Sequence, residues 1–126
     1  MKKEIILTKK APTPIGQYNQ AVKVENTLYV SGQIPIDAET GKIVADDIAK
    51  QTDQVMENIW AILNEAGMDF SNVVKCSIFV KDITDFYIVD AAYEKFFHDD
   101  PPARETVEVA ALPKGAKIEI SCIAVG

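Results

Sequence analysis

The clearest pattern along the chain is a stripe of apolar residues at helical spacing between Asp46 and Ala66. Its positions recur every three or four residues, which places them on one face of an α-helix. Asp46 or Asp47 can cap the first turn, and Gly67 stands where a helix commonly ends in a left-handed residue. The stripe consists of Ile48, Thr52, Val55, Met56, Ile59, Ile62, Leu63 and Ala66.

Around this helix, the remaining patterns predict several β-strands and one further helix. The second helix, Asp85–Phe97, begins at a capping Asp85 and ends before the prolines at 101 and 102. Glu25 and Asn26 separate two strand-like runs by two residues, which predicts a hairpin whose turn uses the left-handed tolerance of Asn. The predicted strands before the final segment are Lys3–Leu7, Ala21–Val24, Thr27–Val30 and Val73–Val80.

The final segment, Pro101–Ser121, predicts two strands joined by a turn at Leu112–Gly115. Alternation places Arg104 on the polar side of the first strand, opposite Val107, and Glu119 on the polar side of the second. If the two strands pair as a hairpin, Arg104 and Glu119 lie on the same face. A fixed cation beside a carboxylate suits a small anionic substrate.

The order of the elements predicts the fold class. A β-rich start, then helix, strand, helix and two strands, is typical of one α+β domain spanning residues 1–126. We expect a mixed or antiparallel sheet with both helices on one face, which would cover Val107, Val109, Ile118, Ile120 and Cys122. The other face is too apolar for water alone, so we expect it to close against copies of the chain, with sites at the seams. Its members are Tyr29, Ser31, Phe79, Arg104, Thr106, Glu119, Ile123 and Val125.

Charge and cysteine usage narrow the function classes. A net charge of −6 opposes binding to a phosphate backbone, which needs a Lys/Arg-rich surface. Cys76 and Cys122 lack CxxC spacing and are interpreted as buried free thiols in a reducing compartment rather than as a disulfide or metal ligands. The apolar run Ile5–Leu7 is too short for a signal peptide or membrane span, so we expect a cytoplasmic protein.

A few residues are candidates for chemistry, each with an ordinary alternative. Arg104 is either a surface ion-pair partner or a clamp for a carboxylate, and Glu119 is either an exposed strand carboxylate or a group that orients water. Tyr18 lies in a Pro- and Gly-containing loop and serves either packing or binding. Ser31 before Gly32 can offer a hydroxyl or backbone donors to a ligand. No metal site is expected, because the chain has one histidine, and no nucleotide-binding motif is present.

Short motifs over nearly the whole chain match those of one known family. They are Ala11-Pro12 with Ile15-Gly16 and Tyr18, Ser31-Gly32-Gln33-Ile34-Pro35, Gln51-Thr52, Val80-Lys81-Asp82, Tyr93-Glu94-Lys95-Phe96-Phe97, Pro102-Ala103-Arg104, Val107-Glu108-Val109-Ala110, Leu112-Pro113-Lys114 and Lys117-Ile118-Glu119-Ile120. In these motifs the chain strongly resembles the Rid/YjgF family of reactive intermediate deaminases, in its imine-deaminase branch.

The resemblance implies a chorismate-mutase-like α+β fold and a homotrimer with sites between subunits. It also implies hydrolysis of 2-imino acids, such as 2-iminobutanoate and 2-iminopropanoate, to 2-oxo acids and ammonia, with no cofactor or metal. By the resemblance, Arg104 clamps the substrate carboxylate and Glu119 positions the attacking water. The backbone around Thr106, with Ser31 and Gly32 nearby, meets the imine end, and Tyr18 closes the pocket from the neighbouring subunit.

Three positions depart from the common family pattern. Thr106 stands where many members have Cys, Asp90 where many have Asn, and Gln17 where Pro is common. Asp90 is a substrate-binding candidate, and its extra negative charge is expected to weaken the binding of an anion.

Two other functions are alternatives to imine hydrolysis. One is a regulatory protein that binds 2-oxo acids, which needs Arg104 but not Glu119. The other is an RNA-cleaving translation inhibitor, which the net charge opposes.

Overall fold

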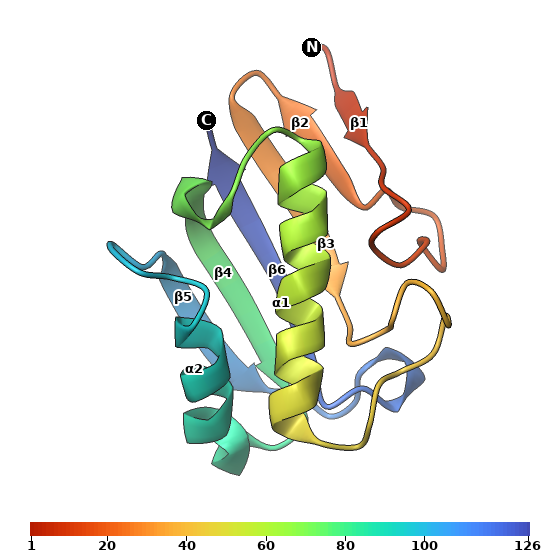
Figure 1. The fold of residues 1–126 in the computed structure, drawn as a ribbon, viewed down its shortest axis with the longest axis vertical. Helices are drawn as coiled ribbons and strands as arrows, with labels where there is room; N and C mark the ends of the chain where they lie inside the picture. The colour runs from red at the N-terminus through yellow and green to blue at the C-terminus, as the bar shows by residue number, and fades with distance from the viewer.

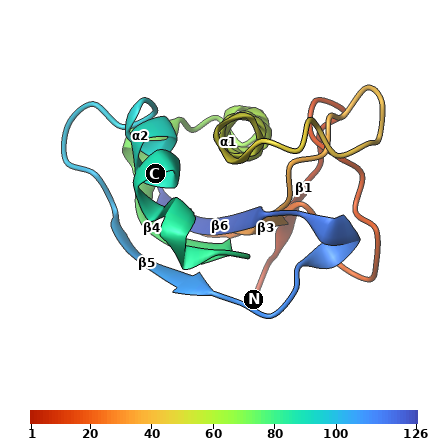
Figure 2. The ribbon, with the colours of Figure 1, turned by 90° about the horizontal axis from the view of Figure 1, so that it is seen from below.

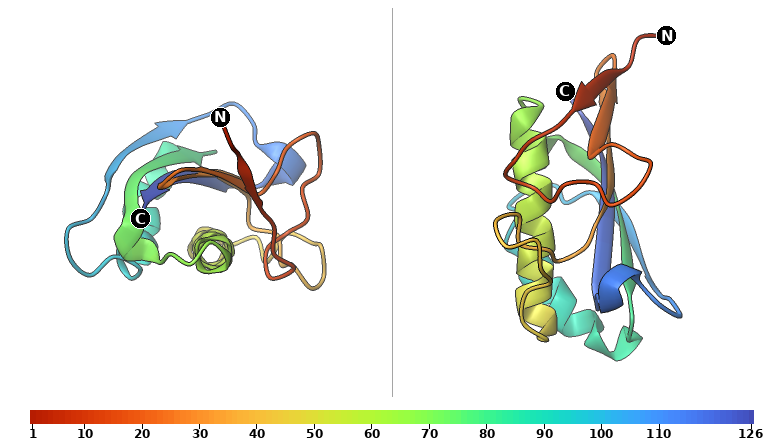
Figure 3. Two further views of the ribbon diagram at one scale, coloured as in Figure 1. Left: turned by 90° about the horizontal axis from the view of Figure 1, so that it is seen from above. Right: turned by 90° about the vertical axis from the view of Figure 1, so that its right-hand side faces the viewer.

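One six-stranded β-sheet carries two α-helices side by side on one of its faces (Figures 1 and 3). The computed structural model describes residues 1–126. Seen end-on, the helices occupy one side of the sheet and the other side is left uncovered (Figure 2). The elements are β1 (Glu4–Ile6), β2 (Ala21–Val24), β3 (Thr27–Gln33), α1 (Ile48–Glu65), β4 (Val73–Val80), α2 (Phe86–Glu94), β5 (Ala103–Glu108) and β6 (Ile118–Val125).

The strand order across the sheet is β1-β2-β3-β6-β4-β5. Every neighbouring pair is antiparallel except β4 and β5, which run parallel, so the predicted mixed α+β sheet is confirmed. The predicted hairpin between β2 and β3 is also confirmed. Its left-handed residue is Glu25, with a φ of 53°, and not the Asn26 that the sequence favoured.

The predicted final hairpin is wrong, because β4 lies between β5 and β6. The helix α2 connects β4 to β5, and such a crossover lets the two strands pair in parallel. The chain then passes around the end of β4 to reach β6. Hydrogen bonds fix both ends of this loop, one to the last residue of β4 and one to the residue after it. The Val109 amide donates to the Val80 carbonyl (2.9 Å), and the Lys81 amide donates to the Lys117 carbonyl (3.0 Å).

The new pairing also corrects the predicted faces of β5. Arg104 lies in register with Cys76, a residue buried beneath the helices, and therefore points to the helix side of the sheet. Thr106 lies in register with the buried Ile78 and shares that side. Val107 was expected under the helices and is instead 41% exposed. In β6, by contrast, the predicted core positions Ile118, Ile120 and Cys122 are all buried.

The predicted long helix is confirmed as α1, with its apolar stripe in the core. The Asp47 carboxylate caps it by accepting from the Lys50 amide (2.9 Å), and Gly67 follows its end with a φ of +75°. The second helix is shorter than predicted, because α2 ends at Glu94. Asp85 makes no capping hydrogen bond there; the side-chain cap is made earlier, by Asp82 on the Thr84 amide.

Cys76 and Cys122 lie opposite one another on the paired strands β4 and β6. Both thiols are buried and free, as predicted, and burial raises the pKa of each. They belong to the main hydrophobic cluster that α1 closes over the sheet. No helix of the structure has both the length and the apolar content that a bilayer crossing requires.

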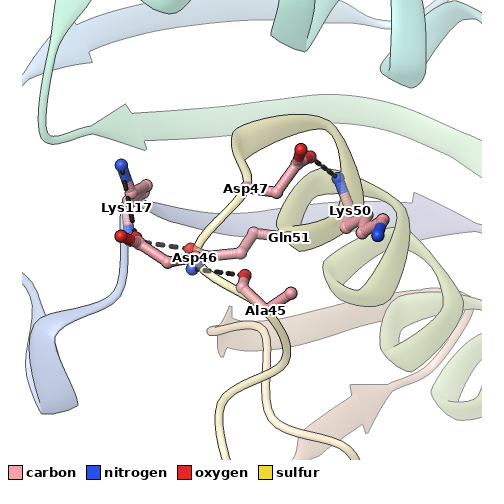
Figure 4. Close-up of polar contacts among 6 residues, drawn as sticks. All are labelled: Ala45, Asp46, Asp47, Lys50, Gln51 and Lys117. Atoms are coloured by element: carbon pink, nitrogen blue, oxygen red, sulfur yellow. Dashed lines mark hydrogen bonds and ion pairs between the residues drawn. The ribbon is translucent and has the colours of Figure 1, made fainter.

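A buried glutamine, Gln51, ties the first turn of α1 to the start of β6 (Figure 4). Its side-chain oxygen accepts from the Lys117 amide (2.9 Å), and its side-chain nitrogen donates to the Ala45 carbonyl (3.3 Å). Lys117 also forms an ion pair with Asp46 at 3.3 Å. These contacts fix the backbone two residues before Glu119.

Candidate active site

Arg104 is held at the sheet edge by side chains of α2. One guanidinium nitrogen, Nη2, lies 2.6 Å from the Asp90 carboxylate. The guanidinium carbon stands 4.9 Å from the centre of the Tyr93 ring and 5.5 Å from that of Phe86. Aromatic faces attract a cation, so these rings fix the position of the charge without neutralising it.

Solvent can reach this cation. The Arg104 side chain is 23% exposed and that of Asp90 is 40% exposed. The ion pair with Asp90 is the only polar contact of the guanidinium within the chain. Its other donors are therefore available to an incoming carboxylate, in the two-pronged geometry that arginine favours.

Glu119 lies in a pocket on the uncovered face of the sheet, with a volume of about 310 Å³. It makes no hydrogen bond or ion pair, and its partial burial raises the pKa of its carboxyl group. The carboxylate rests against Gly32: a Cβ atom on that glycine would lie 2.3 Å from the Glu119 Oε2 atom. A glycine on β3 is thus what lets the carboxylate enter the pocket. The pocket is lined by Ile15, Tyr18, Ser31, Gly32, Ile34, Pro113 and Glu119.

Two short contacts fold the loop before β2 over this pocket. The Ser31 hydroxyl donates to the Asn19 carbonyl (2.6 Å), and the Ile15 amide donates to the Tyr18 hydroxyl oxygen (3.2 Å). Tyr18 remains 44% exposed, so its ring forms part of the rim and is not a core residue. The sequence left packing and binding equally open for Tyr18, and its exposure favours binding.

The loop itself is anchored by Gln20, a residue that the sequence analysis missed. Its side chain is buried and accepts from the Thr8 amide (2.7 Å). Its nitrogen donates to the carbonyls of Thr8 (3.0 Å) and Pro12 (2.9 Å). Nothing in the local sequence marks it, because a single glutamine before a strand is equally common on a surface.

The structure brings the predicted site residues together in two groups and not in one. Tyr18, Ser31, Gly32 and Glu119 share the pocket on the uncovered face, as strand alternation predicted for Ser31 and Glu119. Arg104, Asp90 and Thr106 lie on the helix side at the edge formed by β5. The sheet separates the two groups, and β4 stands between the strands of Arg104 and Glu119. One small molecule therefore cannot touch both within a single chain.

β5 is the last strand of the sheet, and its outer edge has no strand partner. Backbone N–H and C=O groups along such an edge are available to a ligand or to another chain. Thr106 lies on this edge, so its backbone is open to the contact that the sequence resemblance implied. No cluster of three or more His, Cys, Asp or Glu side chains is placed to hold a metal ion.

A larger hollow than that of Glu119 lies elsewhere, beside α1. It has a volume of about 610 Å³ and is lined in part by Trp60, Phe70, Phe96 and His98. It is a wide, open depression that holds none of the predicted site residues. We therefore place the candidate site at the smaller pocket of Glu119, where a free carboxylate meets an exposed aromatic ring.

Comparison with known proteins places this geometry in a family. A family model described as Endoribonuclease L-PSP matches residues 8–126. The chain is 47% identical over 123 residues to the 2-iminobutanoate/2-iminopropanoate deaminase of Rattus norvegicus, covering 98% of this chain and 90% of that protein.

Solved structures show the same fold. A protein of the Rid family from Yersinia pestis, described as of unknown function, has a TM-score of 0.97 and 48% identity, covering 99% of this chain and all of that one. TdcF of E. coli with bound serine has a TM-score of 0.94 and 39% identity, covering 98% of each chain. With sequence and fold matched from end to end, the chain belongs to the Rid/YjgF family.

Proposed function

We propose that the protein hydrolyses 2-imino acids, including 2-iminobutanoate and 2-iminopropanoate, to 2-oxo acids and ammonia. The observation that carries this proposal is the free carboxylate of Glu119, half-buried in a pocket beside Gly32. The solvent-reachable guanidinium of Arg104 supplies the complementary grip on an acid. A relative that is 47% identical bears the name of this activity, and a structural relative holds serine, an amino acid of similar size.

The active form in this proposal is a homotrimer with its sites between subunits. Arg104 and Glu119 lie on opposite faces of the sheet, so a site that uses both must take them from two copies. The uncovered face supports such an assembly, because Tyr29, Val107 and Val125 leave 51%, 41% and 43% of their surfaces exposed. Exposed apolar patches of this kind usually mark contact surfaces. The two unpaired thiols suit a reducing compartment, which favours a cytoplasmic location.

The proposed reaction needs little beyond orientation. Arg104 of one subunit binds the substrate carboxylate and fixes the adjacent C=N carbon, which is electrophilic when the nitrogen is protonated. Glu119 of the neighbouring subunit accepts a proton from a water molecule as its oxygen attacks that carbon. The carboxyl group then returns the proton to nitrogen. As the C–N bond breaks and ammonia leaves, the new hydroxyl group gives its proton to the Glu119 carboxylate and becomes the carbonyl oxygen of the 2-oxo acid. Ammonia takes up this proton, which restores the carboxylate. A raised pKa keeps Glu119 closer to the pH at which it can both accept and return a proton.

A competition assay tests the activity. Threonine dehydratase generates the imine, semicarbazide traps it, and added protein should divert it from the trap to 2-oxobutanoate. Arg104→Ala and Glu119→Gln should each abolish the diversion. Full activity in the Glu119→Gln variant would show that this carboxylate does not take part in the reaction. Failure of the unmutated protein to divert imine would refute the proposed activity.

Mixing the two inactive variants tests the shared site. In trimers assembled at random from equal amounts of Arg104→Ala and Glu119→Gln chains, about one quarter of the sites combine the two intact residues. Activity should return toward that fraction after the variants are unfolded and refolded together. A mixture that forms mixed trimers and remains inactive would contradict an active site that takes Arg104 from one subunit and Glu119 from its neighbour.

The other two functions predict different results in these assays. A regulatory protein that binds 2-oxo acids would lose binding with Arg104→Ala and keep it with Glu119→Gln, without diverting any imine. RNA cleavage, which the name Endoribonuclease L-PSP of the matching family model suggests, has little support in a chain of net charge −6.

A further inference from the structure

Asp90 gives Arg104 a counter-ion before any ligand arrives. Its Oδ1 atom lies 2.6 Å from Arg104 Nη2, and the pair links α2 to β5. No other acidic side chain is paired with this guanidinium: Glu105, the next residue on β5, is paired with Lys75 at 2.9 Å. A ligand carboxylate that binds Arg104 therefore comes to rest beside a second carboxylate.

This arrangement treats the substrate and the product of the proposed reaction differently. A 2-oxo acid has a net charge of −1. The Asp90 carboxylate repels it, and the 2-oxo acid has no positive group whose attraction to Asp90 would offset that repulsion. A protonated 2-imino acid carries a positive nitrogen on the carbon next to its carboxylate, so it is neutral overall. When Arg104 holds the carboxylate, the positive nitrogen is on the carbon next to the bound acid group, in the field of the Asp90 carboxylate that contacts the same guanidinium.

We propose that Asp90 selects the protonated 2-imino acid over the 2-oxo acid product by charge, and so limits product inhibition at the Arg104 site. This inference rests on the proposed function. Asp90 acts through Arg104 and through its own field, and it takes no part in the bond changes. Because its side chain is 40% exposed, water screens its charge, and we expect about a tenfold effect on the binding of an anion.

Calorimetric titration with two stable ligands tests the selection. 2-Oxobutanoate represents the anionic product, and 2-aminobutanoate, a zwitterion, stands in for the protonated imine. Asp90→Asn should tighten 2-oxobutanoate about tenfold and should leave 2-aminobutanoate unchanged or weaker. The inhibition constant of 2-oxobutanoate in the imine assay should fall by the same factor.

Two further variants separate charge from structure. Glu94→Gln removes one negative charge from the exposed end of the same helix, where no ion pair is made, and should alter neither ligand. Asp90→Glu keeps the charge and should keep the preference for the zwitterion. Thermal unfolding of each variant shows whether the pair with Arg104 also contributes to stability.

The outcomes distinguish the inference from the proposed function. If Asp90→Asn changes both ligands by the same factor or changes neither, Asp90 only orients Arg104 and the inference is wrong. If both ligands bind and Arg104→Ala abolishes their binding, Arg104 is the carboxylate-binding residue, and this conclusion does not depend on the role of Asp90. If neither ligand binds the unmutated protein, the proposed function fails together with the inference.

Discussion

Gly32→Ala should damage catalysis while leaving the fold intact. The new methyl carbon would lie 2.3 Å from Glu119 Oε2 and 2.8 Å from its carboxyl carbon, whereas ordinary contact begins near 3.4 Å. The carboxylate must therefore move by about 1 Å. A displacement of this size in a reacting group costs roughly a hundredfold in rate.

Stability should change little, for two reasons. The atoms in the way are the far end of a flexible side chain that has no hydrogen-bond partner to lose. An off-rotamer side chain costs about 1 kcal/mol, and replacing glycine with alanine lowers the entropy of the unfolded chain by a similar amount. Thermal unfolding should thus stay close to that of the unmutated protein, and kcat in the semicarbazide competition assay should fall about a hundredfold with KM nearly constant.

Gly16→Ala is the matched control. A methyl group at Gly16 would lie 3.6 Å from the Tyr18 ring, which is an ordinary contact, so this variant should keep its activity. Full activity in a folded Gly32→Ala variant would mean that the carboxylate seen beside Gly32 is not the group that positions water. Equal losses in both variants would instead indicate a general effect on the loop.

Three other predictions address the anchors of the site. Arg104→Lys keeps the charge but loses the planar fork, so kcat/KM should fall about 10- to 100-fold, the value of one charge-assisted hydrogen bond; an unchanged kcat/KM would exclude two-pronged binding. Gln51→Leu leaves the Lys117 amide without its acceptor and should lower the unfolding free energy by about 1–2 kcal/mol in urea titrations, whereas no loss would show that water replaces the side chain. Glu119→Gln should raise the melting temperature at neutral pH. Burial raises the pKa of Glu119 in the folded state, so the unmutated protein loses stability as the pH rises from the unfolded-state pKa through the folded-state pKa. A glutamine has no charge to bury and avoids this loss. A melting temperature that stays the same or falls in this variant, measured from pH 4 to 8, would contradict the expected cost of the buried charge.

The sequence predicted the parts of this fold that depend on local spacing. The stripe of α1, the strand Val73–Val80 and the hairpin between β2 and β3 all follow from periodicity and turn residues, which act within a few positions. The partner of β5 could not be predicted in this way. Alternation shows that a segment is a strand, and it carries no information about which strand lies next to it.

The same limit applies to the candidate site. Side-chain chemistry and strand alternation singled out Arg104 and Glu119, and the motif resemblance supported both, but the interpretation that both lie on one face assumed a hairpin that does not exist. Gln20 escaped notice, and Gln51 was named only as part of a family motif, because their importance comes from carbonyl and amide groups that fold next to them from distant parts of the chain. A glutamine in a sequence shows its polarity and gives no sign of burial.

Cys76 and Cys122, the two free thiols that lie in register beneath α1, offer a direct way to follow the separation of the helices from the sheet. A thiol reagent added to the native protein meets neither sulfur, since both lie in the hydrophobic cluster. Labelling must wait for the helix layer to separate from the sheet, so its rate in dilute denaturant reports the frequency of that event. The chain thus contains its own probe of cooperative unfolding, which needs no engineered label.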